Sequence, residues 1–172
     1  MGADEVIELL GLEPLAGEGG MWAQTWRDGH SSAICFLLRP GDFSALHRLD
    51  GVELWHHYAG AAVEMLLLQP DGTVSRPRLG DDLAASEQPM TAVAAGTWMA
   101  ADTRGEWSLV GTTMAPPFDD AGCELGDRAE LTAAYPAAAA DIERFTREQC
   151  ASDGRRSPEV PAAHLEERAD GP

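Results

Sequence analysis

Eight short apolar runs, separated by turn sequences at near-regular spacing, constrain the fold of this chain more than any other feature. Glycine, proline and aspartate fill the turns, and the PDG sequence at Pro70–Gly72 is a hairpin signal, because glycine accepts a positive φ. No helical segment interrupts the series, and this pattern is typical of an antiparallel β-barrel or sandwich. The runs occupy residues 21–26, 32–38, 52–59, 62–69, 74–79, 90–95, 97–102 and 107–115.

Helix-forming segments flank this strand-rich region on both sides. Residues 4–12 carry apolar side chains at helical spacing and end in glycine and proline, which predicts a short N-terminal helix. Residues 127–149 are rich in helix formers, and Pro136 divides them into two short helices. The rest of the chain is polar, proline-rich and aperiodic. We therefore predict a single domain over residues 1–149 and a disordered tail over residues 150–172.

The charge balance excludes several classes of partner. Twelve arginines and no lysine stand against 29 acidic residues, so the formal net charge is −17 and the pI is near 4.4. Such a surface repels nucleic acids and anionic membranes, and the lack of lysine excludes Schiff-base chemistry. Three cysteines without metal or CxxC spacing fit a reducing compartment, and the N-terminus carries no long apolar run. We expect a cytoplasmic protein that binds neither nucleic acid nor membrane.

Four residues in the segment 41–60 follow one another at the spacing of a known motif. They are Gly41, His47, Glu53 and Gly60. The series resembles the first motif of the cupin superfamily, in which a second histidine follows two residues after the first; here that position is Leu49. The second cupin motif would fall on residues 94–100, where Met99 occupies the histidine position.

The chain as a whole is similar to the small cupins of the cupin-5 family, whose chemistry is mostly unassigned. The resemblance implies an all-β fold, a double-stranded β-helix or jelly-roll cupin barrel, with short helices at both ends and usually paired as a homodimer. Substitutions at several family positions indicate a pocket that has been rebuilt. The matching segments are 11–14, 36–50, 53–60, 95–102 and 115–120.

A cupin metal is normally held by three histidines and a carboxylate, and only His47 and Glu53 remain of these four. Two protein ligands are too few for a tightly held transition metal, so we predict no metal and no cofactor. Without a metal, the two side chains form an acid–base pair in an apolar barrel. Strand alternation places His57 on the same face as Glu53, as an accessory group, unless a bulge intervenes.

These residues favour an enzyme that moves protons on a small molecule without a metal: an isomerase, epimerase or cyclase using His47, Glu53 and His57. Two other classes stay open, namely a metal-dependent cupin oxygenase or lyase with one recruited ligand, and a non-catalytic ligand-binding module. A purely structural hydrogen-bonded pair is the plainest alternative for His47 and Glu53. The residues expected to bind the substrate are Ser44, Arg48, Trp55, Trp98 and Met99.

Overall fold

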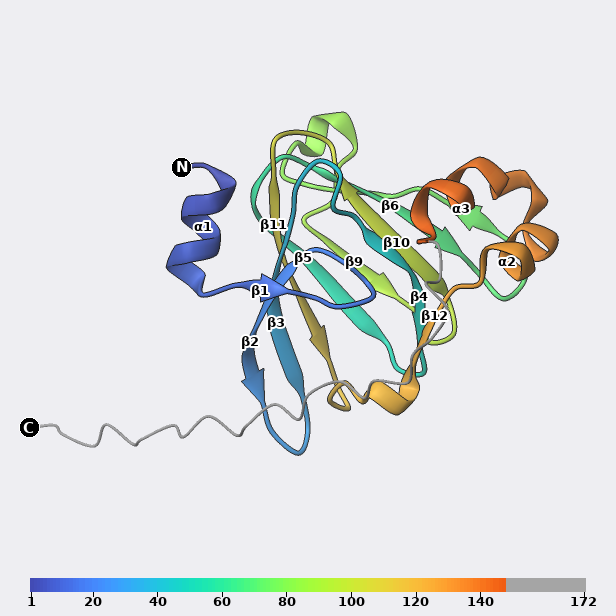
Figure 1. Ribbon diagram of the computed structural model, residues 1–172, viewed down its shortest axis with the longest axis horizontal. Helices are drawn as coiled ribbons and strands as arrows, with labels where there is room; N and C mark the ends of the chain where they lie inside the picture. The colour runs from blue at the N-terminus through green and yellow to red at the C-terminus, as the bar shows by residue number, and fades with distance from the viewer. Residues whose placement is uncertain (148–172) are drawn as a thin grey trace, which may run out of the picture.

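Two antiparallel sheets face each other in the computed structural model, which describes residues 1–147 (Figure 1). The first sheet contains, in spatial order, β1 (Glu13–Pro14), β2 (Met21–Arg27), β3 (Ser32–Leu38), β11 (Ser108–Met114), β5 (Glu53–Gly60) and β9 (Met90–Val93). The second contains β12 (Cys123–Leu125), β4 (Ser44–Leu49), β10 (Trp98–Thr103), β6 (Val63–Leu68) and β7 (Val74–Ser75), with β8 (Arg78–Leu79) also paired to β6. This arrangement confirms the predicted all-β double-stranded β-helix.

Short helices lie at both ends of the described chain, as predicted. The N-terminal helix α1 (Ala3–Leu10) ends at Gly11, whose positive φ of 62° closes the helix in the left-handed conformation. At the other end, α2 (Arg128–Ala134) and α3 (Ala139–Phe145) are separated by a 3₁₀ turn that begins at Pro136. Two further 3₁₀ turns are Leu83–Ala85 and Asp120–Gly122. The predicted tail, residues 150–172, lies outside the described residues.

The hairpin predicted at Pro70–Gly72 joins β6 to β7. Gly72 adopts a φ of 89°, and the Gln69 amide donates to the Thr73 carbonyl at 2.8 Å. The apolar run 74–79 forms two short strands instead of one, β7 and β8, because Pro77 between them has no N–H to donate to a ladder.

Side-chain alternation along β4 and β10 divides the core into two clusters on opposite faces of the second sheet. We call the cluster between the two sheets the inner cluster; it comprises Phe36, Leu38, Leu49, Trp55, Val63, Met65, Leu67, Leu79, Val93, Met99, Ala101, Val110 and Met114. We call the cluster beneath α2 and α3 the outer cluster; it comprises Leu46, Leu66, Leu68, Trp98, Ala100, Leu131, Ala138, Ile142 and Phe145. Helix α1 and the connection after it pack separately, with Val6 and Leu12 against Met21 and Leu37 of the first sheet.

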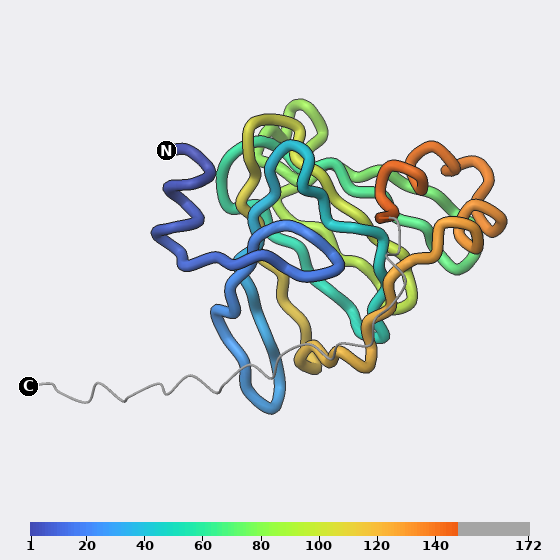
Figure 2. The backbone as a smooth tube through the Cα atoms, viewed as in Figure 1, coloured from blue at the N-terminus to red at the C-terminus, as the bar shows by residue number. Residues whose placement is uncertain are grey.

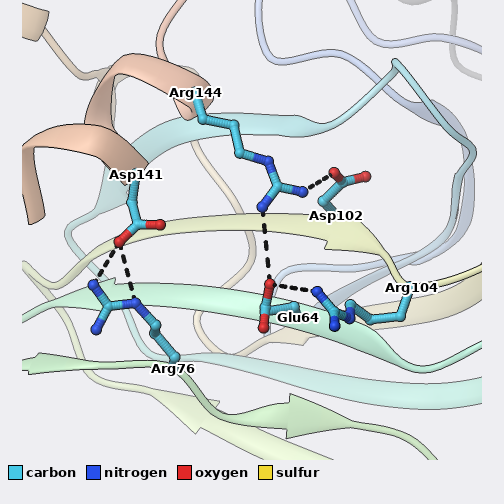
Figure 3. A network of polar contacts seen from close by, with 6 residues as sticks. All are labelled: Glu64, Arg76, Asp102, Arg104, Asp141 and Arg144. Carbon is cyan, nitrogen blue, oxygen red and sulfur yellow. Dashed lines mark hydrogen bonds and ion pairs between the residues drawn. The ribbon is translucent and has the colours of Figure 1, made fainter.

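Ion pairs fasten α3 to the outer face of the second sheet (Figure 3). Asp141 pairs with Arg76 at 2.5 Å, and Arg144 pairs with Asp102 and, at 3.8 Å, with Glu64. The network is exposed enough for solvent to weaken each pair, so it fixes the position of α3 more than it stabilises the fold. None of the helices in residues 1–147 has the length and apolar character needed to cross a membrane.

Candidate functional site

His47 and Glu53 come from different sheets and face the space between them. His47 lies on β4 and Glu53 begins β5, and the turn of residues 50–52 joins these strands. The neighbours of His47 along the strand, Leu46 and Arg48, point to the opposite face, where Leu46 belongs to the outer cluster. Only 3% of His47 and 7% of Glu53 is exposed. Two ionisable side chains therefore share an interior that is lined largely by apolar residues.

A backbone hydrogen bond selects the tautomer of His47. Its Nδ1 lies 2.8 Å from the carbonyl oxygen of Ala45. A carbonyl oxygen only accepts hydrogen bonds, so Nδ1 carries a proton and donates. Nε2 is therefore the nitrogen that gains or loses a proton when the imidazole titrates.

Two neighbours hold the carboxylate of Glu53. The indole Nε1 of Trp55 donates to Oε2 of Glu53 at 2.8 Å, and the Thr112 side chain on β11 also hydrogen-bonds the carboxylate. Trp55 itself is only 1% exposed and packs against the edge of the Phe36 ring, with 6.0 Å between ring centroids. Trp55 thus orients Glu53 as well as lining the interior, a second role beyond the predicted contact with substrate.

A second carboxylate, Glu18, joins the pair and is absent from the sequence-based prediction. It belongs to the glycine-rich loop 15–20, and its Oε1 accepts a hydrogen bond of 2.6 Å from the Ser44 hydroxyl. The same oxygen lies 3.8 Å from Nδ1 of His47. The one local feature in the sequence that marks Glu18 is that it is an acidic residue between two glycines. Its approach to Ser44, 26 positions away, depends on the folded barrel, so pattern reasoning on one sequence misses it.

The three groups shift one another's protonation. Burial disfavours the imidazolium, but the carboxylates of Glu18 and Glu53, helped by the Ala45 carbonyl, outweigh it and raise the pKa of His47. Burial also raises the pKa of Glu53; the imidazole of His47 opposes this rise, Glu18 adds to it, and hydrogen bonds to the carboxylate oppose it. Both shifts have the sign that favours proton transfer near neutral pH, because a raised carboxyl pKa makes a stronger base.

Two further side chains line this part of the interior. Met99, predicted to contact substrate, lies opposite His47 in the β4–β10 register and is 1% exposed. Cys123 lies opposite Leu49 in the β4–β12 register. Burial raises the pKa of the Cys123 thiol to about 12, with added contributions from nearby carboxylates that include Glu18 and Glu53. The thiol therefore remains protonated and is a weak nucleophile.

Three predicted site residues are not brought to the pair. His57 shares the inner face of β5 with Glu53, because the register shift between β5 and β11 comes after His57. Its ring Nε2, however, donates to the Ala61 carbonyl at 3.1 Å, near the end of β5 that is far from Glu53. Trp98 belongs to the outer cluster. The guanidinium of Arg48 lies 4.6 Å from the centre of the Trp98 ring and pairs with Glu124. Alternation explains the last two, since they neighbour Met99 and His47 in sequence and so face outward.

Two surface hollows lie near the site, and neither has His47 or Glu53 in its lining. One, of about 240 Å³, is lined by the loop residues Leu15, Gly17 and Gly19 together with Arg147. The other, of about 350 Å³, is lined by β4 and β12 residues that include Leu49 and Cys123. His47 and Glu53 are themselves buried, and the hollows lie at the loop 15–20 and beside β12.

The donor set does not fit a metal ion. Within the described range 1–147, no group of three or more His, Cys, Asp or Glu side chains could hold one. Leu49 and Met99 occupy the two positions where the cupin motifs have further histidines, and Nδ1 of His47 is bonded to a backbone carbonyl. A tightly held transition metal generally needs three protein donors, and this site presents too few in a suitable arrangement.

The chain matches the family described as Cupin superfamily (DUF985) over residues 4–126, more than half of its length. The fold and the remaining motif residues agree with this match, and the chain belongs to that family. A solved structural-genomics protein from Shewanella oneidensis is 33% identical, covers 86% of this chain and 98% of its own, and superimposes with a TM-score of 0.81. The search of curated proteins returned no match.

More distant solved structures share the fold alone. A hypothetical protein from Leishmania major is 24% identical, with 86% of this chain and 100% of its own covered and a TM-score of 0.80. The R92A mutant of Bacillus subtilis oxalate decarboxylase is 11% identical, with 78% of this chain and 37% of its own covered and a TM-score of 0.55. At such identities the similarity defines a double-stranded β-helix and carries no activity with it.

Proposed function

We propose that this protein is a metal-independent isomerase, epimerase or cyclase that moves protons on a small organic molecule bound between the two sheets. The observation that supports this most is a buried histidine whose charged form is favoured by two carboxylates, each from a different structural element: Glu18 from the loop and Glu53 from β5. Buried ionisable groups with raised pKa values concentrate at functional sites.

The chemistry follows from the two raised pKa values. Glu53 accepts a proton from the carbon next to a carbonyl group, while the His47 imidazolium gives its Nε2 proton to the carbonyl oxygen. The product is a neutral enol, and no oxidant or reductant is consumed. Glu53 then gives its proton back to carbon, on the other face for an epimerisation or on the other carbon for an isomerisation, and His47 regains a proton from an enol oxygen. Glu18 stabilises the imidazolium that is present before the first step and is formed again after the second.

The charges of the interior favour a neutral or cationic, partly apolar substrate. Glu18 and Glu53 together exceed the single positive charge that His47 can carry. Arg48 pairs with Glu124 on the outer face, so it is not available to hold a phosphate or carboxylate beside the pair. Trp55 and Met99 supply apolar contact, and Ser44 holds Glu18 in place.

Solvent exchange tests the proposal on a panel of simple carbonyl compounds. Small neutral or amine-bearing ketones and hydroxyketones are incubated with the protein in D₂O containing a chelator, and loss of the proton signal next to the carbonyl is followed by NMR. The expected result is exchange in at least one compound, reduced at least about 100-fold by Glu53→Gln, since a positioned acid–base group contributes about 10²–10⁴ in rate.

The matched control is Glu13→Gln, which neutralises an exposed carboxylate five residues before Glu18 and should retain full exchange. Exchange that persists in Glu53→Gln would remove that residue from the chemistry. Exchange that requires an added metal would favour an oxygenase- or lyase-type cupin. A compound that binds and is recovered without exchange would favour a non-catalytic binding module.

We also propose that the protein is a cytoplasmic homodimer. Helix α1 covers only part of the outer face of the first sheet. The remaining part, on β5 and β9, carries Leu54, Tyr58 and Met90, of which Tyr58 is 55% and Met90 is 49% exposed. An exposed apolar sheet face of this kind suits association with a second copy. Sedimentation of the protein and of Tyr58→Glu tests this: a dimer should become a monomer, whereas a monomeric native protein would contradict it.

A further inference from the structure

The loop 15–20, which carries Glu18, joins β1 to β2; in Figure 2 it is the blue turn in front of the strands. Backbone bonds fix it at both ends. The Leu15 amide donates to the Gly20 carbonyl at 3.0 Å, and the Ala45 amide of β4 donates to the Glu18 carbonyl at 2.8 Å. The loop is thus bonded to β4 at Ala45, two residues before His47 on the same strand.

Arg147, just beyond α3, holds the same loop from outside. Its guanidinium donates to the Phe43 carbonyl at 3.0 Å, to Asp42 Oδ1 at 3.3 Å and to the Glu18 carbonyl at 3.4 Å. The guanidinium carbon also lies 4.4 Å from the centre of the Phe43 ring. Asp42 in turn accepts a hydrogen bond of 3.0 Å from the Gly20 amide. One arginine therefore joins three segments that are distant in sequence: the loop, the start of β4 and the C-terminal helices.

Gly19 leaves the space that this arginine fills. It adopts a φ of 96°, and a Cβ there would overlap the guanidinium of Arg147 and the carbonyl oxygen of Phe43. Gly17 also has a positive φ, of 83°, but a Cβ there would meet only Leu125 at an ordinary 3.4 Å. Glycine at position 19 is therefore required by two contacts, with the Arg147 guanidinium and with the Phe43 carbonyl, beyond the demands of the loop conformation.

We propose that Arg147 is a latch that keeps the loop 15–20 closed over the pair, and that it thereby positions Glu18 beside His47 although Arg147 contacts neither side chain. Opening of the loop would remove Glu18 and expose the interior near Ser44, which gives a substrate its way into an otherwise enclosed site. This inference deepens the proposed function and rests on it for its catalytic meaning. The latch itself is testable without any substrate.

Two NMR measurements on the full chain test the latch: hydrogen exchange of the Ala45 and Gly20 amides, and pH titration of the His47 imidazole. The charged groups that face this imidazole are Glu18 and Glu53, while the Cys123 thiol is neutral. In Arg147→Met, exchange of the two amides should accelerate roughly tenfold, as expected for a lowered cost of local opening. The pKa of His47 should fall, because Glu18 leaves its side.

The matched control is Arg144→Met. Arg144 is as exposed as Arg147, stacks on Phe145 as Arg147 stacks on Phe43, and binds α3 to Asp102 instead of binding the loop. This variant should leave both measurements unchanged. Arg147→Lys should restore part of the protection, because it keeps the charge and loses the forked geometry. Glu18→Gln should lower the pKa of His47 without faster amide exchange, since the amide oxygen still accepts from Ser44.

Unchanged amide exchange and an unchanged His47 titration in Arg147→Met would overturn the latch. Equal effects in Arg144→Met would also overturn it, because they would show general loosening of the C-terminal helices. Neither measurement depends on turnover. A protein whose latch behaves as expected but which exchanges no substrate proton would contradict the proposed function alone.

Discussion

The inner and outer clusters are built from alternate residues of the same strands, yet they differ in kind. On β4, Leu46 enters the outer cluster and His47 faces the inner one; on β10, Trp98 and Met99 divide in the same way. In the described chain, the outer cluster is apolar, and charged groups, those of α3 and of Arg48 among them, meet it at its rim. The inner space holds a buried histidine and a buried glutamate. The outer face of the second sheet therefore contributes apolar burial, whereas the inner face also carries the desolvation cost of two buried ionisable side chains.

The largest expected effect comes from the outer cluster. Trp98→Ala should lower the free energy of unfolding by about 3–5 kcal/mol, because it leaves a cavity beneath the C-terminal helices. The His47 titration should stay as in the native protein, since Trp98 faces away from it. Urea unfolding and NMR titration of the same sample check both parts. A large change in the His47 titration would show that the two faces are not independent.

The next largest effect is a difference in unfolding free energy between alanine substitutions at the two loop glycines, Gly19 and Gly17. Gly19→Ala should cost about 2–3 kcal/mol, because backbone strain is joined by the overlap with the Phe43 carbonyl and with Arg147. Gly17→Ala should cost about 1 kcal/mol from backbone strain alone. Urea unfolding of the two variants gives the comparison. Equal losses would mean that both Arg147 and the start of β4 move aside freely and do not constrain the loop.

Replacing one tryptophan of each cluster by phenylalanine distinguishes the effect of lost packing from the effect of the lost hydrogen bond to Glu53. Trp55→Phe leaves Glu53 without its 2.8 Å hydrogen bond, so this variant should lose about 1–2 kcal/mol more than Trp98→Phe. It should also raise the pKa of Glu53 further, because that bond favours the carboxylate. Urea unfolding and carboxyl-carbon NMR measure the two effects. Identical stability in the two variants would show that the Trp55–Glu53 bond contributes nothing.

The smallest effect is in the pH dependence of stability. Folding raises the pKa of His47 above its ordinary value of 6.5, so its contribution is full below about pH 6.5 and is lost as the pH rises through the folded value. The raised pKa of Glu53, from 4.5, acts in the same direction at lower pH. The free energy of unfolding in urea should therefore fall less steeply with rising pH in His47→Gln. Parallel curves would contradict a raised pKa.

Much of the fold could be predicted because local patterns carry it. Short apolar runs and turn residues indicate the barrel, and the spacing from Gly41 to Gly60 indicates the family. The site is harder to predict because its third member arrives by tertiary contact. Glu18 reaches Ser44 from a loop that Arg147 also contacts, and no periodicity reports such contacts. The sequence-based prediction places Trp98 and Arg48 on the wrong side of the sheet, because it does not extend strand alternation from His47 and Met99 to their neighbours.

The most direct test is the NMR titration of the His47 imidazole in the native protein and in Glu53→Gln. An acid–base pair predicts a pKa above the ordinary value of histidine in the native protein, and a lower pKa once the Glu53 charge is removed. A native His47 that titrates at or below the ordinary value, or that is unaffected by Glu53→Gln, would mean that burial prevails over the carboxylates. His47 would then be a structural residue, and the proton-transfer proposal would fail.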